Sequence, residues 1–332
     1  MPNRTDINKR ILITGIAGFI GFHLADCLLK QGIVVKGIDN LNSYYDPILK
    51  QARLDRLRQY NGFEFIKDDI SCMDVVDGIF KQFDPAIIVN LAAQAGVRYS
   101  IENPRVYMDS NVIGFFNILE ACRKYKPEHL VYASSSSVYG NQQKTPFSVT
   151  DHTDTPISLY AATKKANELM AYTYAHLYNV PCTGLRFFTV YGPYGRPDMA
   201  YFIFTKNIIE GTPIKVFNNG NMYRDFTYID DITKCLEIIL YNPPINEPFA
   251  RVYNIGNNKP ELLAGFIKVL EEVIGKSASM LNLPMQAGDV YQTFADVKDL
   301  SENFNFKPST DIRIGLTAFV KWYRDYYNKK DA

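Results

Sequence analysis

Tyr160 and Lys164 are the residues whose types and spacing most clearly suggest chemistry in this 332-residue sequence. Two residues four positions apart lie on one face of a helix. A lysine ammonium beside a phenol favours the phenolate, so the pair predicts a pKa for Tyr160 below the ordinary value of about 10. Such a tyrosine could take a proton from a substrate hydroxyl while a nicotinamide takes the hydride from the same carbon. The pair alone is common by chance, so its interpretation depends on what precedes it.

Three glycines, Gly15, Gly18 and Gly21, follow an apolar run and open a helical pattern. Glycines there permit a tight turn and let backbone N–H groups approach a pyrophosphate, and the helix N-terminus adds partial positive charge. Their spacing is GxxGxxG instead of the better-known GxGxxG, and glycines that only pack a helix are the alternative interpretation. The position between a strand and a helix favours a dinucleotide-binding loop.

A carboxylate stands at the end of the second predicted strand. Asp39 lies where an acidic side chain can bind a ribose 2′-hydroxyl. Asn40 follows it, with no Arg or Lys alongside to accept a 2′-phosphate, which favours NAD over NADP as the cofactor. Asp69 and Ile70, after the third strand, are expected to border the adenine. The alternatives are a turn residue at position 39 and an ordinary loop at 68–69.

Short apolar runs alternate with helical patterns through the first half of the chain. This alternation predicts an α/β fold with a Rossmann-type, doubly wound parallel sheet. The expected strands cover residues 11–14, 34–38, 63–66, 86–91, 130–133 and 183–188. The expected helices cover residues 19–31, 74–83, 111–125 and 158–178, and the last of these carries Tyr160 and Lys164.

The pattern changes after residue 186, where glycines and prolines mark an irregular segment at 192–197. Helices are expected near 201–209, 261–274 and 311–327, and strands at 224–229 and 252–255 are expected to return to the first domain. The sequence therefore predicts two domains. The NAD-binding domain comprises 1–186 plus about 226–258, and a smaller, discontinuous α/β substrate-binding domain comprises about 187–225 plus 259–332.

Composition disfavours several classes of function. Hydrophobic residues make up 47% and charged residues 21%, and the formal net charge is +1, with no basic run and no acidic tail. These values are typical of a soluble globular protein, so neither nucleic acid nor a membrane is an expected partner. No apolar run approaches the roughly 20 residues of a membrane span, and the polar N-terminus lacks a signal region. Five scattered cysteines favour the cytoplasm, and four histidines without ligand spacing predict no metal.

Several longer segments resemble the extended short-chain dehydrogenase/reductase family, and within it the UDP-glucuronate 4-epimerases. The resemblance covers nearly the whole chain and rests on residues 14–21, 91–100, 134–140, 158–164, 184–193, 195–199 and 224–231. It implies a homodimeric isomerase with tightly bound NAD that acts on a UDP-hexuronic acid. In the implied reaction, UDP-glucuronate becomes UDP-galacturonate through a transient 4-keto intermediate, with no net oxidation.

The resemblance also assigns roles to individual positions. Ser135 would be the catalytic hydroxyl, Tyr160 the acid/base, and Lys164 the residue that binds the nicotinamide ribose. Further contacts with the cofactor are implied for Phe19, Ile20, Leu91, Ala92, Ala93, Asn111 and Phe187.

On the substrate side, Arg224 would meet the diphosphate and Asp289 the uridine ribose, while Thr189 and Arg196 would face the hexose. Two positions depart from the family pattern: Gln286, where related epimerases often have an arginine, and Tyr194, where a larger aromatic is frequent. Both departures concern contacts with the substrate and leave the reaction chemistry unchanged.

A uronate substrate adds a chemical requirement. Its 4-keto intermediate is a β-keto acid, which loses CO₂ unless the carboxylate is held out of alignment with the carbonyl π-system. Arginine grips a carboxylate bidentately, so Arg196 is the expected carboxylate clamp, assisted by Thr189 and Ser136. Arg98 is the second candidate.

Three other functions stay open on the sequence. A UDP-glucose or UDP-N-acetylglucosamine 4-epimerase is disfavoured by Arg196. Related dehydratases and decarboxylases carry acidic residues where Ser136 and Ser137 stand here, which disfavours those reactions. A non-catalytic NAD-binding regulator would tolerate the loss of Tyr160 or Lys164, yet both are present.

Overall fold

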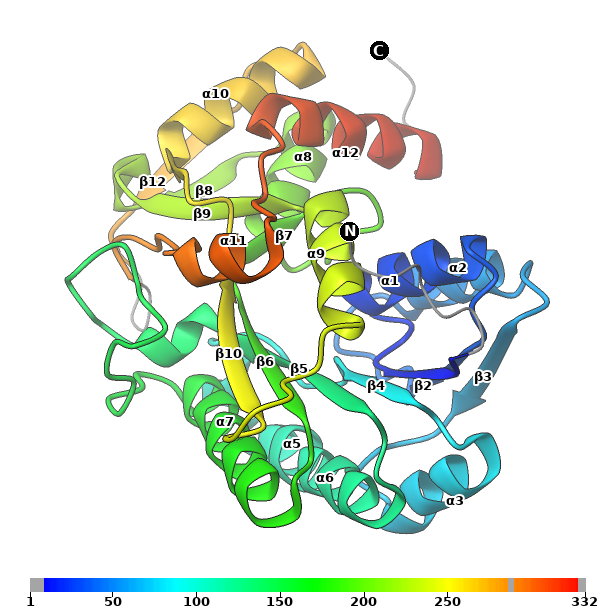
Figure 1. The fold of residues 1–332 in the computed structure, drawn as a ribbon. Coiled ribbons are helices and arrows are strands. Elements are labelled where there is room, and N and C mark those ends of the chain that lie inside the picture. Colours follow the sequence, from blue (N-terminus) through cyan, green and yellow to red (C-terminus); the bar gives the residue numbers. More distant parts are fainter. Residues whose placement is uncertain (1–8, 286–289, 328–332) are drawn as a thin grey trace.

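Seven parallel strands form the main sheet of the computed structural model, which describes residues 9–285 and 290–327 (Figure 1). The order of the strands is β10–β6–β5–β4–β1–β2–β3. It reverses between β1 and β4, as in doubly wound folds that bind a dinucleotide at the reversal. The predicted fold class is thereby confirmed. The strands are β1 (Ile11–Thr14), β2 (Val35–Asp39), β3 (Phe63–Lys67), β4 (Ile87–Asn90), β5 (His129–Ser135), β6 (Cys182–Phe187) and β10 (Ala250–Ile255).

Helices cover both faces of this sheet (Figure 1). One face carries α1 (Phe19–Lys30), α2 (Pro47–Leu57) and α9 (Ile229–Leu240), and the other carries α3 (Met73–Phe83), α6 (Gly114–Tyr125) and α7 (Leu159–Tyr178). Successive side chains of a strand point to opposite faces, so Ile11 and Ile13 join one core cluster whereas Leu12 joins the other. Between β4 and α6 the chain forms three short helical segments: α4 (Tyr99–Glu102), α5 (Pro104–Tyr107) and the π-helical η1 (Met108–Ile113).

A smaller lobe lies above one end of the main sheet in the view of Figure 1. Its strands form a three-stranded sheet in the order β11–β9–β7 and a two-stranded sheet of β12 and β8. The strands are β7 (Thr189–Tyr191), β8 (Ile214–Phe217), β9 (Tyr223–Tyr228), β11 (Pro260–Leu262) and β12 (Met280–Leu283). The helices are α8 (Ala200–Glu210), α10 (Leu263–Ile274), α11 (Lys298–Phe304) and α12 (Ile312–Tyr326), and short 3₁₀ segments follow β5 and β8: η2 (Ser136–Tyr139) and η3 (Asn218–Gly220).

One expectation about the returning strands needs correction. The strand predicted at 252–255 pairs with β6 in the main sheet, as expected. The strand predicted at 224–229 instead pairs with β7 and β11 in the smaller lobe. The chain returns through α9, which packs against α1, because β9 leads directly into that helix. The domain boundaries themselves stay a prediction.

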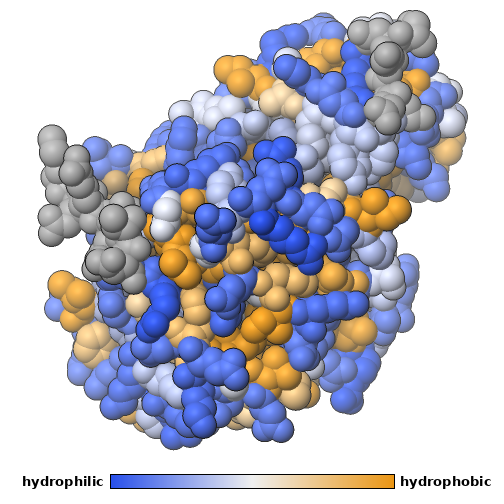
Figure 2. Space-filling view, turned by 90° about the vertical axis from the view of Figure 1, so that its right-hand side faces the viewer, coloured by the Kyte–Doolittle hydropathy of each residue, from blue (hydrophilic) through white to orange (hydrophobic). Residues whose placement is uncertain are grey.

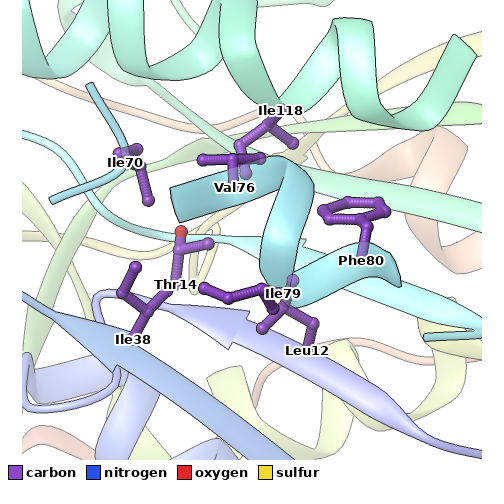
Figure 3. A pocket seen from close by; sticks show the side chains of 8 residues that line it. All are labelled: Leu12, Thr14, Ile38, Ile70, Val76, Ile79, Phe80 and Ile118. Atoms are coloured by element: carbon purple, nitrogen blue, oxygen red, sulfur yellow. The ribbon is translucent and has the colours of Figure 1, made fainter. Parts of the chain in front are cut away.

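A gap inside the larger lobe is lined almost entirely by hydrophobic side chains. Figure 3 shows eight side chains that line this gap between the sheet and the helices α3 and α6: Leu12, Thr14, Ile38, Ile70, Val76, Ile79, Phe80 and Ile118. It has no room for a water molecule, so it belongs to the core and not to a binding site. On the outer face drawn in Figure 2, hydrophobic side chains gather in the lower half, at the level of the main sheet. Within residues 9–285 and 290–327, no helix is both long enough and apolar enough to span a bilayer.

Candidate active site

The three predicted catalytic residues come together at the end of β5 and the start of α7. Ser135 is the last residue of β5, and its Oγ lies 3.1 Å from Ser137 Oγ. Helix α7 begins at Leu159 because the hydroxyl of Ser158 accepts a hydrogen bond from Ala161 N (3.1 Å) and caps the first turn. Tyr160 in that turn is hydrogen-bonded to Ser135. A proton can therefore pass between the phenol and the serine hydroxyl.

Lys164 lies one turn further along α7, but its ammonium does not lower the pKa of Tyr160 below the ordinary value as predicted. Lys164 Nζ donates to Ala133 O at 2.8 Å, and burial lowers the pKa of the ammonium to about 8. Burial also raises the pKa of Tyr160, against the opposing effects of the Ser135 hydrogen bond and the charge of Arg196. The predicted lowering of the Tyr160 pKa is therefore wrong, because desolvation of the phenolate outweighs the nearby cations.

The glycine loop packs tightly between β1 and α1. Gly15 has a φ of +69°, and a Cβ there would lie 2.7 Å from Ala92 N, so only glycine fits. A Cβ at Gly21 would lie 2.4 Å from Gly15 O. Gly18 is the N-cap residue of α1 and has no side chain with which to cap the helix, so the first N–H groups of α1, beginning with Phe19 and Ile20, are suited to an anion. These features fit the pyrophosphate of NAD.

The residues predicted to bind the adenosine lie at the ends of β2 and β3. Asp39 accepts hydrogen bonds from Ala17 N (3.1 Å) and Leu41 N (2.9 Å). Asn40 Nδ2 donates to Asp69 Oδ2 at 2.7 Å, which joins the two strand ends. Ile70 faces the core gap of Figure 3. The oxygens of Asp39 and Asp69 thus lie at the edge of the sheet where a ribose and an adenine would sit.

Lys50 is a cation near Asp39 that the sequence argument did not include. It comes from α2, and its charge opposes burial in setting the raised pKa of Asp39. Its Nζ is held by Asn42, through O at 2.9 Å and Oδ1 at 3.0 Å. The ammonium is therefore hydrogen-bonded to the loop after β2. It is not directed toward a 2′-phosphate, which is consistent with a site for an unphosphorylated ribose.

Asn111 differs from the other residues predicted to line the cofactor, because its side chain makes hydrogen bonds within the protein. It accepts from Gln94 N (2.8 Å) and donates to Gln94 O (3.0 Å) and Thr163 Oγ1 (3.1 Å). These bonds fasten the loop after β4 to α7. The remaining predicted contacts lie in that loop or at the end of β6: Leu91, Ala92, Ala93 and Phe187.

Arg196 makes a bidentate ion pair that the sequence did not indicate. Its Nε and Nη2 donate to the two oxygens of Asp198 at 3.1 and 2.5 Å, and the two side chains are 24% and 28% exposed. Burial opposes the guanidinium charge, yet Asp198 raises the pKa of Arg196, which stays a cation. The hydroxyl of Tyr44 donates to the same Asp198 at 3.1 Å.

Two tyrosines, one from a loop and one from the short helix α5, border the predicted reaction centre. Tyr44 reaches Asp198 from the loop after β2, and the ring of Tyr107 lies edge-on to that of Tyr160, 6.1 Å between centroids. The hydroxyl of Tyr107 donates to the carbonyls of Ala95 (3.1 Å) and Gly96 (2.5 Å). Neither tyrosine stands in a periodic pattern or a spaced motif, so sequence reasoning had no signal by which to find them.

The other predicted substrate residues come from separate elements of the two lobes. Thr189 begins β7 and Ser136 begins η2, both half-buried. Arg224 in β9 donates from Nη1 to Tyr223 O at 2.8 Å. The guanidinium of Arg98 lies 5.5 Å from the ring centre of Phe217. Asp289 and Gln286 lie outside the described residues.

A buried ion pair stands behind the serines. Glu168, one turn after Lys164, receives two hydrogen bonds of 2.8 Å from Arg186 of β6, and the two side chains are only 5% and 4% exposed. Ser134 donates to Glu168 at 2.6 Å, and Arg186 donates to the hydroxyl of Tyr139 at 2.9 Å. One face of α7 therefore carries a reacting group, a strand contact and a buried charge pair in successive turns.

A glycine loop at the reversal of strand order, with a serine, a tyrosine and a lysine beside it, defines a dinucleotide-dependent enzyme of the short-chain dehydrogenase/reductase type. Residues 11–256 match the NAD dependent epimerase/dehydratase family, and the chain belongs to that family. The resemblance deduced from the sequence is thereby confirmed.

Individual relatives match over almost their full length. The chain is 52% identical to Protein CapI of Staphylococcus aureus, over 96% of this chain and 100% of that protein. It is 45% identical to a probable UDP-glucuronate 4-epimerase of Rhizobium meliloti (strain 1021), over 96% of this chain and 98% of that protein. Among solved structures, UDP-glucuronic acid 4-epimerase from Bacillus cereus in complex with UDP-glucuronic acid and NAD superposes with a TM-score of 0.90 at 34% identity, covering 96% of this chain and 100% of that chain.

Proposed function

We propose that this protein is an NAD-dependent epimerase that interconverts UDP-glucuronate and UDP-galacturonate by inverting C4 of the sugar. The observation that carries the proposal is the meeting of Tyr160, Ser135 and Arg196, since Arg196 is close enough to lower the pKa of Tyr160. A base for the C4 hydroxyl and a cation for a sugar carboxylate thus share one site. Two of the proteins named above support it: one is a probable UDP-glucuronate 4-epimerase, and the other is a UDP-glucuronic acid 4-epimerase solved with UDP-glucuronic acid and NAD.

Each residue has a defined part in this chemistry. NAD, when bound on the glycine loop and beside Lys164, supplies the acceptor for the C4 hydride. Tyr160 accepts the proton of the C4 hydroxyl, and Ser135, hydrogen-bonded to Tyr160, holds the reacting oxygen and shares the proton. Lys164 is anchored on Ala133 O, where its remaining N–H groups can meet the ribose of the nicotinamide.

The guanidinium of Arg196 has N–H groups that Asp198 does not use. Asp198 occupies the Nε–Nη2 edge of the guanidinium, so the Nη1–Nη2 edge is the one that a uronate would meet. That grip would keep the carboxylate out of alignment with the C4 carbonyl and so suppress loss of CO₂. Because Asp198 already compensates the charge of Arg196, a neutral sugar is not repelled, and the preference for a uronate has to come from the hydrogen bonds.

The experiment that tests the function is incubation of the purified protein with UDP-glucuronate, UDP-glucose and UDP-N-acetylglucosamine, followed by proton NMR. We expect UDP-galacturonate from the first substrate and little product from the other two. Denaturation of the purified protein should release NAD and no NADP. Equal turnover of UDP-glucose would contradict the assignment to a uronate. If the main product has lost CO₂, the enzyme is a decarboxylase, and if it has lost water, the enzyme is a dehydratase.

Replacing Arg196 with alanine tests the carboxylate clamp. A charge-assisted hydrogen bond is worth about 1.5–3 kcal/mol, so we expect roughly 10- to 100-fold weaker binding of UDP-glucuronate. UDP should bind nearly as before, because it lacks the carboxylate. The freed carboxylate should also leave as CO₂ in part of the turnovers, which mass spectrometry would detect as a 4-keto pentose product.

The matched control is Arg98→Ala, which removes an arginine whose guanidinium lies over Phe217 instead of Asp198. This variant should release no 4-keto pentose. If Arg196→Ala binds UDP-glucuronate as tightly as the wild type while Arg98→Ala does not, the clamp is Arg98.

We also propose that the enzyme is a homodimer in the cytoplasm. Three apolar residues of α7, Leu169, Tyr172 and Leu177, are between 52% and 59% exposed, and Ile113 and Phe116 at the start of α6 are 42% and 41% exposed. The helices α6 and α7 pack side by side, so these residues support an interface between two copies, which light scattering of the purified protein would measure.

All five cysteines are free thiols, which supports a reducing compartment.

A further inference from the structure

The segment that carries Arg196 is held by a half-buried side chain from α1 and a completely buried side chain from α2. His23 of α1 and Arg53 of α2 together bind three consecutive carbonyls, those of Pro193, Tyr194 and Gly195. Arg196 follows directly. A turn that presents a substrate-binding side chain is therefore fixed through its backbone by helices of the other lobe.

Arg53 is the central residue of this connection. It is completely buried, and its guanidinium donates to Tyr194 O from Nε (3.1 Å) and Nη2 (2.6 Å) and to Gly195 O from Nη2 (3.2 Å). Its Nη1 donates to Ala17 O and to the hydroxyl of Tyr45, both at 2.7 Å. These bonds use the fork of N–H groups on both sides of the guanidinium, which a lysine could not reproduce.

Through Ala17, Arg53 is connected to the glycine loop, because Ala17 lies between Gly15 and Gly18. Its N–H donates to Asp39, the expected ribose-binding carboxylate, at 3.1 Å. A single buried guanidinium therefore bridges the pyrophosphate loop and the two residues that precede Arg196.

His23 supports the same turn. Its Nε2 lies 2.8 Å from Pro193 O, and because a carbonyl only accepts, Nε2 carries the proton. The turn needs this support, because Tyr194 has a φ of +56°, in the left-handed region that non-glycine residues rarely adopt. Without the bonds to its carbonyls, such a turn would relax toward ordinary backbone angles.

We propose that Arg53 is a positioning residue that couples the dinucleotide loop to the carboxylate clamp, so that the grip of Arg196 on a sugar carboxylate depends on the bridge between Ala17 and the turn 193–195. The inference rests on the proposed function and extends it. It assigns to a buried residue of the cofactor-binding lobe a part in the choice between a uronate and a neutral sugar.

The test compares Arg53→Lys with the wild type, both purified with their bound cofactor. Lysine keeps the positive charge but cannot reach Ala17 and the turn together. We expect UDP-glucuronate to bind roughly 10-fold more weakly by titration calorimetry, with UDP changed less than about twofold, because neither Ala17 nor the turn 193–195 is among the residues expected to bind UDP. The 4-keto pentose should appear among the products, and the NAD retained per chain should fall.

Arg56→Gln is the matched control. Arg56 lies one turn further along α2 and contacts the side chain of the same Tyr194, with 3.3 Å from Nη1 to the hydroxyl, but it does not hold the backbone of the turn. This variant should bind both ligands as the wild type does. If Arg53→Lys weakens UDP and UDP-glucuronate equally, Arg53 only stabilises the fold and the inference is wrong; unchanged binding of both ligands also overturns it. A wild type that binds UDP-glucose as tightly as UDP-glucuronate would instead contradict the proposed function.

Discussion

Replacing Tyr160 with phenylalanine should leave the fold and the bound NAD intact and reduce turnover of UDP-glucuronate by about 10²–10⁴-fold, the usual contribution of a general acid–base group. The change removes one hydroxyl from a half-buried ring whose other contacts, such as the edge-on packing against Tyr107, remain. Single-turnover kinetics and the NAD content of the purified variant would measure the two effects separately. Activity above about a tenth of the wild type would exclude Tyr160 as the base.

The pH dependence of the reaction follows from the same residue. Burial raises the pKa of Tyr160 above its ordinary value, so the phenol is protonated at neutral pH in the protein without substrate. Deprotonation favours catalysis, so kcat/KM should increase as the pH rises toward that pKa. Since the charge of Arg196 lowers this pKa, the rising limb should move to higher pH in Arg196→Ala and stay in place in Arg98→Ala.

The second large effect concerns stability. Arg186→Met should reduce the free energy of unfolding by about 3–5 kcal/mol, because it leaves the carboxylate of Glu168 buried with only the Ser134 hydroxyl and the longer 3.8 Å contact to Lys165. Glu168 is only 5% exposed in this pair. The double variant Glu168→Leu/Arg186→Met should recover much of the loss, since it removes both charges. Urea unfolding monitored by circular dichroism would give the three values.

An exposed pair supplies the control for this experiment. Arg313 pairs with Glu272 on the surface, with side chains 54% and 43% exposed. Arg313→Met should therefore cost only about 0–1 kcal/mol. If Arg186→Met is as stable as this control, the buried pair does not hold β6 to α7, and the ion pair of Glu168 and Arg186 does not stabilise the strand end that carries Ser134.

The main elements could be predicted because their side chains follow the periods of strands and helices. The strand 11–14 and the long helix from residue 158 to 178 lie where the pattern placed them, within one residue. Helix α2 was missed, because it buries Lys50 and Arg53, and charged residues on an inner face hide the apolar period of a helix. The helix predicted from residue 111 begins as α6 at Gly114, because the π-helical turn η1 precedes it.

The site was predictable only as far as its residues stand in spaced motifs. Ser135, Tyr160 and Lys164 have fixed separations along the chain, and the structure brings them together. Asp198 and Tyr44 meet across 154 positions, and no local pattern records such a contact. The direction of the shift in the Tyr160 pKa was missed for a related reason. Residue spacing indicates which group is a neighbour, but it does not indicate how far folding removes water from the phenol.

The separation between α7 and the loops has an evolutionary consequence. Tyr160, Lys164 and Glu168 repeat at one-turn intervals along α7, so an insertion within that stretch would rotate their side chains apart. The residues expected to face the sugar carboxylate, Arg196 with its partners Asp198 and Tyr44, come instead from the loops after β7 and β2. Under the proposed function, exchange of residues in these loops can therefore change which sugar is accepted while the helix that carries the acid/base stays unchanged.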